Sequence, residues 1–251
     1  MTNYQSNLTD DQWTILSNFF DLKRKRKHGL RDVINAIYYV LKSGCQWRML
    51  PTEFPNWQSV YYYFHKWSRA GLWEDINQIF IHAIREAEQR NEQPTAAIID
   101  SQSVKNTLVP YEKVGYDAGK KIKGIKRHIV TDVLGNLLTV QILPASIQDR
   151  DAAEHVFSKM KRTWKKVTHA FADGGYSGKL IERLKNLKIT LEIVKRNELH
   201  TFKVLPKRWV VERTFSWIEL FRRNSKLFER TEVSATAFIL LSAMKIMLSR
   251  F

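Results

Sequence analysis

The chain has 251 residues, of which 44% are hydrophobic and 26% are charged, so its composition is that of a folded protein and excludes a disordered one. Lysine and arginine outnumber aspartate and glutamate by 41 to 25, and the resulting net charge of +16 favours a polyanionic partner such as nucleic acid. The single cysteine, Cys45, excludes an internal disulfide and a zinc finger built on paired cysteines, which fits a reducing cytosolic setting.

Neither end of the chain predicts export or a membrane anchor. The first residues lack a basic stretch followed by an apolar one, so we expect no signal peptide. The apolar run 237–248 contains Lys245 and falls short of the ~20 residues that span a bilayer. We therefore expect that run to form a buried helix.

The first 94 residues predict a bundle of helices. Thr9 and Gln12 have the spacing of a capping box, which predicts a helix that begins at Asp10. Apolar residues between 33 and 41 recur with the helical period before Gly44, which is placed to end that helix. Further helices are expected over 58–69 and 72–89. A boundary at Pro94 then makes residues 1–94 a helical domain, and we expect that domain to bind DNA.

Two features of this helical part have alternative interpretations. The basic run 23–27 could contact phosphates or could be a solvated linker, and neither is favoured. The aromatic residues Trp57, Tyr61, Phe64 and Trp67 have helical spacing, which favours a core stripe over a platform for base stacking.

Residues 95–251 change period and carry a net charge of +14, against +2 for residues 1–94. Two apolar runs flank Gly135 and Asn136, which predicts a β-hairpin. Strands and helices then alternate, which predicts an α/β fold with a mixed sheet flanked by helices. The expected strands are 95–100, 126–133, 137–143, 167–172 and 189–194, and the expected helices are 151–162, 178–187 and 206–223.

Three carboxylates stand out by their positions in this predicted order. Asp100 ends the first strand, Asp173 ends a later strand before a Gly-Gly turn, and Glu212 lies on a helix. Ligands collect at strand ends of α/β sheets, so the three side chains could share a site, and oxygen ligands suit Mg²⁺ or Mn²⁺. Two such ions would activate a nucleophile and stabilise the leaving oxygen of a phosphodiester.

Each carboxylate also has a purely structural interpretation. Asp100 could cap a turn with Ser101, Asp173 could belong only to the turn that follows it, and Glu212 could pair with Arg208 on one helix face. Taken singly, these interpretations are favoured. Spacing alone therefore does not establish a shared metal site.

Several segments together resemble the DDE transposases of bacterial insertion sequences, in particular those of the insertion sequence 5 type. The resemblance covers nearly the whole chain in the expected order. It rests on KHGLRDVINAIYYVLKSGCQWRMLP (27–51), FPNWQSVYYYFHKW (54–67), IIDSQSVK (98–105), FADGGYSG (171–178) and RWVVERTFSWIELFRRNSK (208–226). It implies an RNase H-like catalytic domain over residues 95–251, in which the catalytic Asp100, Asp173 and Glu212 bind two Mg²⁺ or Mn²⁺ ions.

By the same resemblance the chain is a DNA transposase. It would bind the terminal inverted repeats of its element, cleave the ends by two-metal hydrolysis and join the freed 3′-hydroxyl to target DNA. Its partners would be transposon-end and target DNA and further copies of itself, a dimer or more in the synaptic complex, without a membrane. The implied location is the bacterial cytoplasm, in association with the nucleoid.

The helix around Glu212 departs from the family pattern at two positions. Arg208 matches the arginine found four residues before the glutamate, whereas a tyrosine and a lysine often found nearby are Leu205 and Glu219 here. Other basic side chains could supply the missing charge, although solvated faces would have the same pattern. The residues that we expect to contact DNA are Lys105, Lys120, Lys121, Lys123, Lys126, Arg127, Arg208, Arg213, Arg222 and Arg223.

Three residues near these segments are assigned no role in the site. Asp149 and Asp151 are interpreted as the acidic first turn of a helix, and His128 as a core or surface imidazole. Two other functions also stay open for the chain as a whole. It could be a DNA-binding repressor or inhibitor derived from a transposase, or a nuclease that cleaves without joining. The three carboxylates argue against the first, and the N-terminal blocks against the second.

Overall fold

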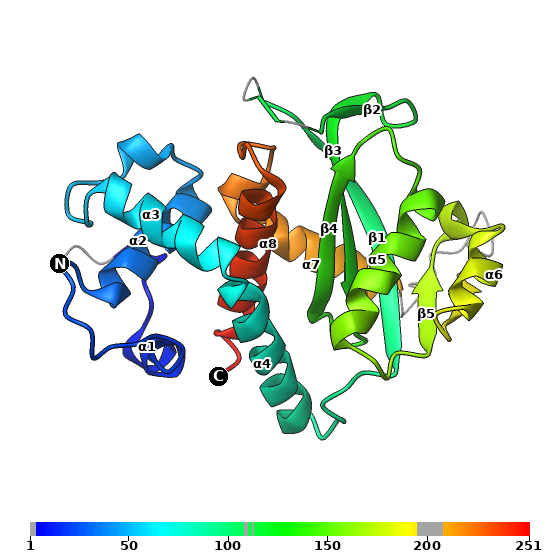
Figure 1. Cartoon of the computed structure of the whole chain (residues 1–251), viewed down its shortest axis with the longest axis horizontal. Coiled ribbons are helices and arrows are strands. Elements are labelled where there is room, and N and C mark those ends of the chain that lie inside the picture. The colour runs from blue at the N-terminus through cyan, green and yellow to red at the C-terminus, as the bar shows by residue number, and fades with distance from the viewer. Residues whose placement is uncertain (1–3, 108–109, 112, 195–207) are drawn as a thin grey trace.

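The computed structural model describes residues 4–107, 110–111, 113–194 and 208–251. Figure 1 shows the N-terminal helices gathered on one side, the sheet on the other, and helix α8 between them. Residues 195–207 lie outside the described part of the chain, and they include Leu205 and the start of the expected helix 206–223.

Four helices form the N-terminal region: α1 (Asp10–Ser17), α2 (Leu30–Ser43), α3 (Trp57–Arg69) and α4 (Leu72–Ala87). The Thr9 hydroxyl accepts a hydrogen bond from the backbone N–H of Gln12, and this capping box starts α1 where it was predicted. Gly44 ends α2 with a φ of +73°, in the left-handed region that favours glycine. A short 3₁₀ turn, η1 (Trp47–Met49), leads toward α3.

The sheet is mixed and its strands do not follow chain order. Strand β3 (Ile122–Thr131) pairs antiparallel with β1 (Ala96–Lys105), with β4 (Leu137–Pro144) and with the short β2 (Gly115–Asp117). On its other side β1 pairs parallel with β5 (His169–Ala172), which pairs parallel with β6 (Thr190–Ile193). This is the mixed sheet expected of an α/β fold, and the predicted hairpin is β3 and β4.

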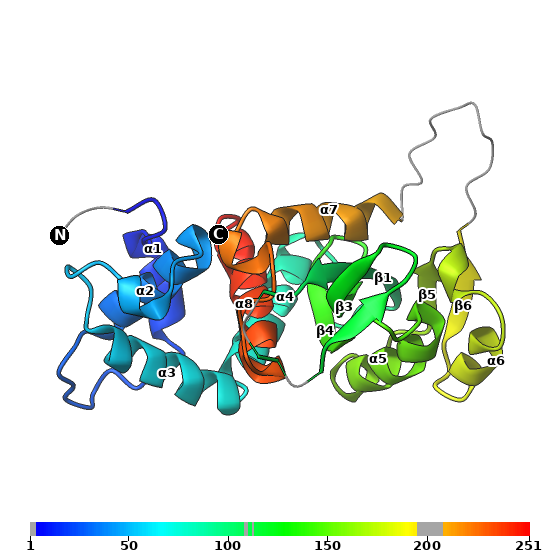
Figure 2. The ribbon, with the colours of Figure 1, turned by 90° about the horizontal axis from the view of Figure 1, so that it is seen from above.

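Helices cover both faces of the sheet. Figure 2 shows α7 (Arg208–Glu219) along one face and α5 (Asp149–Thr163) along the opposite one, with α6 (Leu180–Lys185) near β6. Side chains that alternate along β1 confirm this: Ser101 bonds to Asp149 of α5, and Gln102 bonds to Glu219 of α7. The two helices therefore lie on opposite faces of β1.

Helix α8 (Glu232–Met247) joins the two halves of the molecule. It packs against α2, α3 and α4 on one side and against β4 and α7 on the other. Its Phe238 ring stacks on Phe64 of α3 with a centroid distance of 4.7 Å. The expected buried helix over 237–248 is thus part of α8, and within the described residues no helix is long and apolar enough to cross a membrane.

A buried ion pair ties the end of α4 to the β3–β4 hairpin. The guanidinium of Arg85 lies 2.6 Å from the carboxylate of Asp132, and both side chains are almost fully buried. Asp132 also accepts hydrogen bonds from the backbone of Leu134 and from Asn136, so its charge is fully engaged. The tie fixes the sheet relative to the helical region.

Candidate active site

Asp100 lies within a strand instead of at its end, which corrects the prediction. Strand β1 continues to Lys105 because β3 pairs with it that far, whereas the described pairing with β5 stops at Ile98. The difference arises because the two neighbours of β1 have different lengths. Asp100 therefore lies where the parallel neighbour ends and one edge of β1 opens, which is the kind of place where α/β sheets bind ligands.

Asp173 follows directly on the last residue of β5. Continuing the pairing of Ile98 with Phe171 by two residues places Asp173 beside Asp100 and on the same face of the sheet. Both aspartates lie beside Ile98, Phe171 and Val194 at this edge of the sheet. The Oδ1 of Asp173 accepts a hydrogen bond of 2.9 Å from the N–H of Gly175, and the Oδ1 of Asp100 one of 2.7 Å from that of Ser101.

Glu212 is carried by the helix on the face toward which Asp100 points. Buried Val211, Phe215 and Ile218 hold α7 against the fold, while Glu212 is on its exposed side. Glu219, which bonds to Gln102 of β1, lies two turns further along the same stripe, about 10 Å along the helix axis. Among the described residues, no group of three or more His, Cys, Asp or Glu side chains is arranged to hold a metal ion.

The paired aspartates fit a divalent metal ion. Mg²⁺ takes oxygen ligands and is commonly held by one or two carboxylates, with waters and substrate phosphates completing its coordination. Asp100 and Asp173, side by side where β5 ends, supply such a pair.

Tyr176 is a neighbour of both aspartates that the sequence reasoning missed. Tyr176 is the last residue of the turn η2 (Gly174–Tyr176), and its side chain is buried. Burial raises the pKa of Tyr176 well above its usual range, and the carboxylates of Asp100 and Asp149 raise that pKa further. The hydroxyl therefore stays protonated at neutral pH. Its position in the block FADGGYSG, three residues after Asp173, was the available signal.

The predicted DNA-contacting residues separate into exposed and buried groups. The exposed ones have side chains available to a polyanion, and three of them flank the junction of β2 and β3. The side chain of Arg208, the first residue of α7, is outside the described part of the chain. The exposed residues are Lys105, Lys120, Lys121, Lys123 and Arg222.

Lys126 and Arg127 are corrections to the predicted DNA-contacting set. Lys126 is 7% exposed, and its ammonium lies 3.1 Å from Asp149 and 3.8 Å from Asp117. Arg127 is 3% exposed and donates to the backbone oxygen of Asn224, and burial lowers its pKa to about 10. The strand that carries both residues is covered on both faces by helices, which the local alternation of lysines did not reveal.

Two further arginines have internal partners. Arg223 is buried, pairs with Glu229 at 2.6 Å and donates to the backbone oxygen of Cys45, which corrects its predicted DNA contact. Arg213 lies between the rings of Trp209 and Trp217 and donates to the backbone oxygen of Leu134. Arg213 is therefore held by the β3–β4 turn and by its own helix.

The N-terminal region has a basic and aromatic groove. A hollow of about 370 Å³ separates the loop after α1 from the outer side of α3. Tyr62 is 59% exposed. The core stripe predicted for this helix is confirmed only in part, because Phe64 and Trp67 are buried but Tyr61 is exposed. Among the residues that line the hollow are Arg24, Lys25, Arg26, Tyr62, Tyr63 and Lys66.

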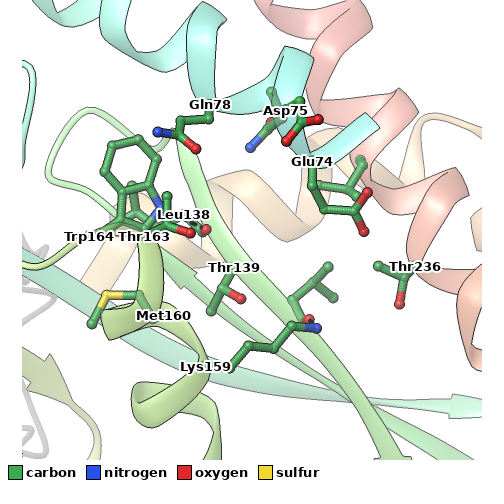
Figure 3. Close-up of a pocket in the computed structure, with 13 residues that line it drawn as sticks. Glu74, Asp75, Gln78, Leu138, Thr139, Lys159, Met160, Thr163, Trp164 and Thr236 are labelled. Carbon is green, nitrogen blue, oxygen red and sulfur yellow. Dashed lines mark hydrogen bonds between the residues drawn. The ribbon is translucent and has the colours of Figure 1, made fainter. Parts of the chain in front are cut away.

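A second hollow lies where the helical region meets the sheet (Figure 3). It holds about 140 Å³ between α4, β4, α5 and α8, and includes none of the three predicted catalytic carboxylates. Figure 3 shows Glu74 and Lys159 reaching into it from opposite sides. Burial raises the pKa of Glu74 and lowers that of Lys159, and the Lys159 ammonium donates to the backbone oxygen of Val140. The hollow is therefore a partly polar part of the interface between the helical region and the sheet.

Two family models match the chain and together cover most of it. One, described as "Transposase DDE domain", matches residues 91–248. The other, described as "Putative transposase of IS4/5 family", matches residues 8–77. All three predicted catalytic carboxylates fall within the first match, and the basic and aromatic groove falls within the second.

Two curated proteins of Burkholderia cepacia are similar to parts of the chain. A "Putative transposase for insertion sequence element IS402" is 32% identical over 124 residues, which are 46% of this chain and 59% of that protein. An "Insertion element IS402 uncharacterized 16.2 kDa protein" is 25% identical over 108 residues, which are 39% of this chain and 72% of that protein. Among solved structures, the catalytic domain of Mos1 mariner transposase aligns with a TM-score of 0.29 and 8% identity, over 69% of this chain and 91% of that one.

Proposed function

The chain belongs to the transposase DDE domain family, and on that premise we propose that it is a DNA transposase that cleaves and joins the ends of an insertion sequence. Transposases of this family use divalent metal ions. The observation that carries the proposal is the placement of Asp100 and Asp173 side by side where β5 ends. A carboxylate pair in a basic protein suits chemistry on a polyanion.

The proposed site uses Asp100 and Asp173 as ligands for Mg²⁺ or Mn²⁺, with Glu212 of α7 completing the set for two ions. The bound ions would supply an activated water or 3′-hydroxyl and stabilise the departing oxygen of the phosphodiester. The backbone N–H groups of Ser101 and Gly175 orient the two aspartates, since each donates to one carboxylate oxygen. Cleavage and joining are both in-line displacements at phosphorus, so one set of ligands serves both steps.

Two surfaces are proposed to contact DNA. On the sheet, Lys105 and Lys123 lie on neighbouring strands, where the N–H of Asn106 donates to the backbone oxygen of Lys123. Lys120 and Lys121 precede β3 at the same end. On the N-terminal region, the groove lined by Arg24, Lys25, Lys66 and Tyr62 combines positive charge with an aromatic face. The groove supports a DNA-binding role for residues 1–94.

The proposed substrates are the terminal inverted repeats of the element and target DNA. Pairing two DNA ends requires at least two active sites, so a dimer or larger assembly is proposed for the synaptic complex. The proposed setting is the bacterial cytoplasm at the nucleoid, where the DNA substrate is.

The proposal is tested by metal-dependent cleavage of a labelled duplex that carries the DNA ends flanking the gene. The wild type is expected to nick the end junction with Mg²⁺ or Mn²⁺ but not with EDTA. Asp173→Asn, which removes one ligand charge with little change of shape, is expected to reduce cleavage at least about a thousandfold while end binding stays the same.

Glu192→Gln is the matched control for that test. Glu192 is an exposed carboxylate on β6, the neighbour of β5, so its neutral variant changes the net charge equally. We expect it to cleave like the wild type. Specific end binding by the wild type without cleavage under any metal would instead identify a DNA-binding repressor or inhibitor. Cleavage without joining would identify a nuclease.

A further inference from the structure

A partly buried polar network lies behind Asp100, on the α5 face of the sheet. The hydroxyl of Ser101, the residue after Asp100, donates to Oδ1 of Asp149 at 2.7 Å. The same Asp149 oxygen lies 3.1 Å from the ammonium of Lys126, which also donates to the backbone oxygen of Ile147 at 2.9 Å. Asp149, the first residue of α5, thus does more than begin a helix.

The network has two similar arms that meet at Lys126. In the first arm Ser101 donates to Asp149, and in the second Ser103 donates to Asp117. Lys126 lies between the two carboxylates, 3.1 Å from Asp149 and 3.8 Å from Asp117. The arms use the same residue types and the same strand. They differ in that Ser101 adjoins Asp100, whereas Ser103 lies two residues further away.

Lys126 is the cation that balances Asp149. A second basic side chain beside Asp149, that of His128, is fully buried, and burial lowers the pKa of His128 to about 4. His128 is therefore neutral near pH 7. Taking a carboxylate and an ammonium out of water is costly unless they pair in good geometry. The ammonium holds Asp149 on the sheet, and Asp149 in turn holds Ser101.

The first arm also reaches the segment that carries Asp173. Turn η2 packs against α5, and the carboxylates of both Asp100 and Asp149 act on the buried hydroxyl of Tyr176. Asp149 thus lies close to residues that follow each of the two aspartates. The second arm has no comparable neighbour among the described contacts: Asp117 is engaged by Ser103, by Lys126 and by the N–H of Lys120.

We propose that Ser101 and Asp149 are positioning residues that fix the Asp100 carboxylate for metal binding. The inference rests on the proposed function. One residue, Ser101, holds Asp100 through its backbone N–H at 2.7 Å and is itself anchored through its hydroxyl. A residue anchored at its side chain keeps its peptide group in one orientation, and the N–H of that group aims the carboxylate. Partners of metal ligands of this kind typically contribute about 10-fold to 100-fold in metal affinity.

The test compares Ser101→Ala with Ser103→Ala in the full chain. Each variant removes one hydroxyl that donates to a carboxylate paired with Lys126, so both lose one serine–carboxylate hydrogen bond. Mn²⁺ binding without DNA is measured by the electron paramagnetic resonance of free Mn²⁺, with Asp100→Asn as the blank. We expect Ser101→Ala to bind Mn²⁺ about tenfold more weakly than the wild type, and Ser103→Ala to bind it like the wild type. Melting temperatures without metal check that both variants fold.

A double-mutant cycle separates positioning from loss of structure. If Ser101 acts through Asp149, then Asp149→Ala, which removes the accepting carboxylate, weakens Mn²⁺ binding by itself, and adding Ser101→Ala to it has little further effect. Additive losses would mean that the two residues act separately, which would overturn the proposal. Asp117→Ala, on the second arm, is the matched control and should leave Mn²⁺ binding unchanged.

The outcomes distinguish failure of this inference from failure of the proposed function. Equal Mn²⁺ binding by Ser101→Ala and Ser103→Ala would overturn the positioning role and leave the proposed site intact. If the wild type binds no more Mn²⁺ than Asp100→Asn, the metal site itself is wrong, and the inference falls with it.

Discussion

Positive charge is used differently in the N-terminal helices and in the sheet. Around the groove on α3, the side chains of Arg24, Lys25 and Lys66 are exposed to a partner. In the sheet region, Lys126 and Arg127 are as basic but are buried against carboxylates and backbone oxygens. Clustered lysine and arginine therefore indicate a DNA surface only where the fold leaves them in water. Buried, the same residues stabilise the protein.

Removing Lys126 should give the largest effect on stability. Lys126→Met leaves Asp117 and Asp149 without their buried cation, and breaking a buried pair typically costs about 3–5 kcal/mol. We expect a loss in that range in the free energy of unfolding, measured by urea denaturation. Lys123→Met, on an exposed position of the same strand, is the control and should change stability by less than about 0.5 kcal/mol. Equal stability of the two variants would contradict the comparison.

Acid should destabilise the sheet through His128. The pKa of His128 is lowered from 6.5 to about 4 by burial, against the opposing effect of Asp149. Between these two values the unfolded chain binds a proton that the folded chain does not, so this contribution to stability is present above pH 6.5 and is lost as pH falls toward 4. From pH 7.5 to 4.5 it amounts to about 2–3 kcal/mol.

The measurement compares wild type with His128→Leu, because carboxylates also titrate in this range. Urea unfolding at both pH values should show a smaller acid loss for His128→Leu. If both proteins lose the same stability between the two pH values, then folded His128 either binds its proton as readily as in the unfolded chain or does not change protonation in this pH range.

Neutralising the N-terminal groove should weaken DNA binding without affecting the fold. Replacing Arg24, Lys25 and Lys66 by glutamine should reduce affinity for the end duplex about 10-fold to 100-fold at moderate salt. Each lost phosphate contact reduces the slope of log affinity against log salt by about 0.9, so the triple variant should lose about 2 to 3 in slope. Fluorescence anisotropy over a salt series measures both quantities.

A triple variant with the same charge change controls for net charge. Lys165, Lys166 and Lys185 are exposed near α5 and α6, away from the groove lining. Their glutamine variant should keep a slope within about 1 of the wild type. If both triple variants lose the same slope, the groove has no special role and only the overall charge attracts DNA.

Local signals in the sequence predicted the helices of the N-terminal region. The capping box at Thr9 and the glycine at 44 each act within one turn of helix, so neighbouring residues suffice to place α1 and α2. The hairpin of β3 and β4 was predicted for the same reason. The end of β1 was not, because its length depends on β3, which pairs with it antiparallel from a distant part of the chain.

The candidate site shows the same difference between features that local sequence encodes and features that depend on distant residues. The sequence and its family blocks identified Asp100 and Asp173 as candidates, but Asp149 was interpreted only as the start of a helix. Its contacts to Ser101 and Lys126 join residues 48 and 23 positions apart in sequence, and no local pattern encodes them. Tyr176 was missed because its proximity to Asp149 depends on the packing of η2 against α5.

The types of the main helices and strands, the mixed α/β class and the available chemistry could be predicted from sequence, because period, caps and residue types are local properties. The tertiary structure decided which charges face water and which are buried, and it decided which carboxylates become neighbours. Those outcomes depend on strand order and on which helix covers which face of the sheet. Lys123 and Lys126 differ by three positions in one strand and so point to opposite faces of the sheet. The carboxylates of Asp149 and Asp117 make Lys126 a structural cation, whereas Lys123 stays exposed.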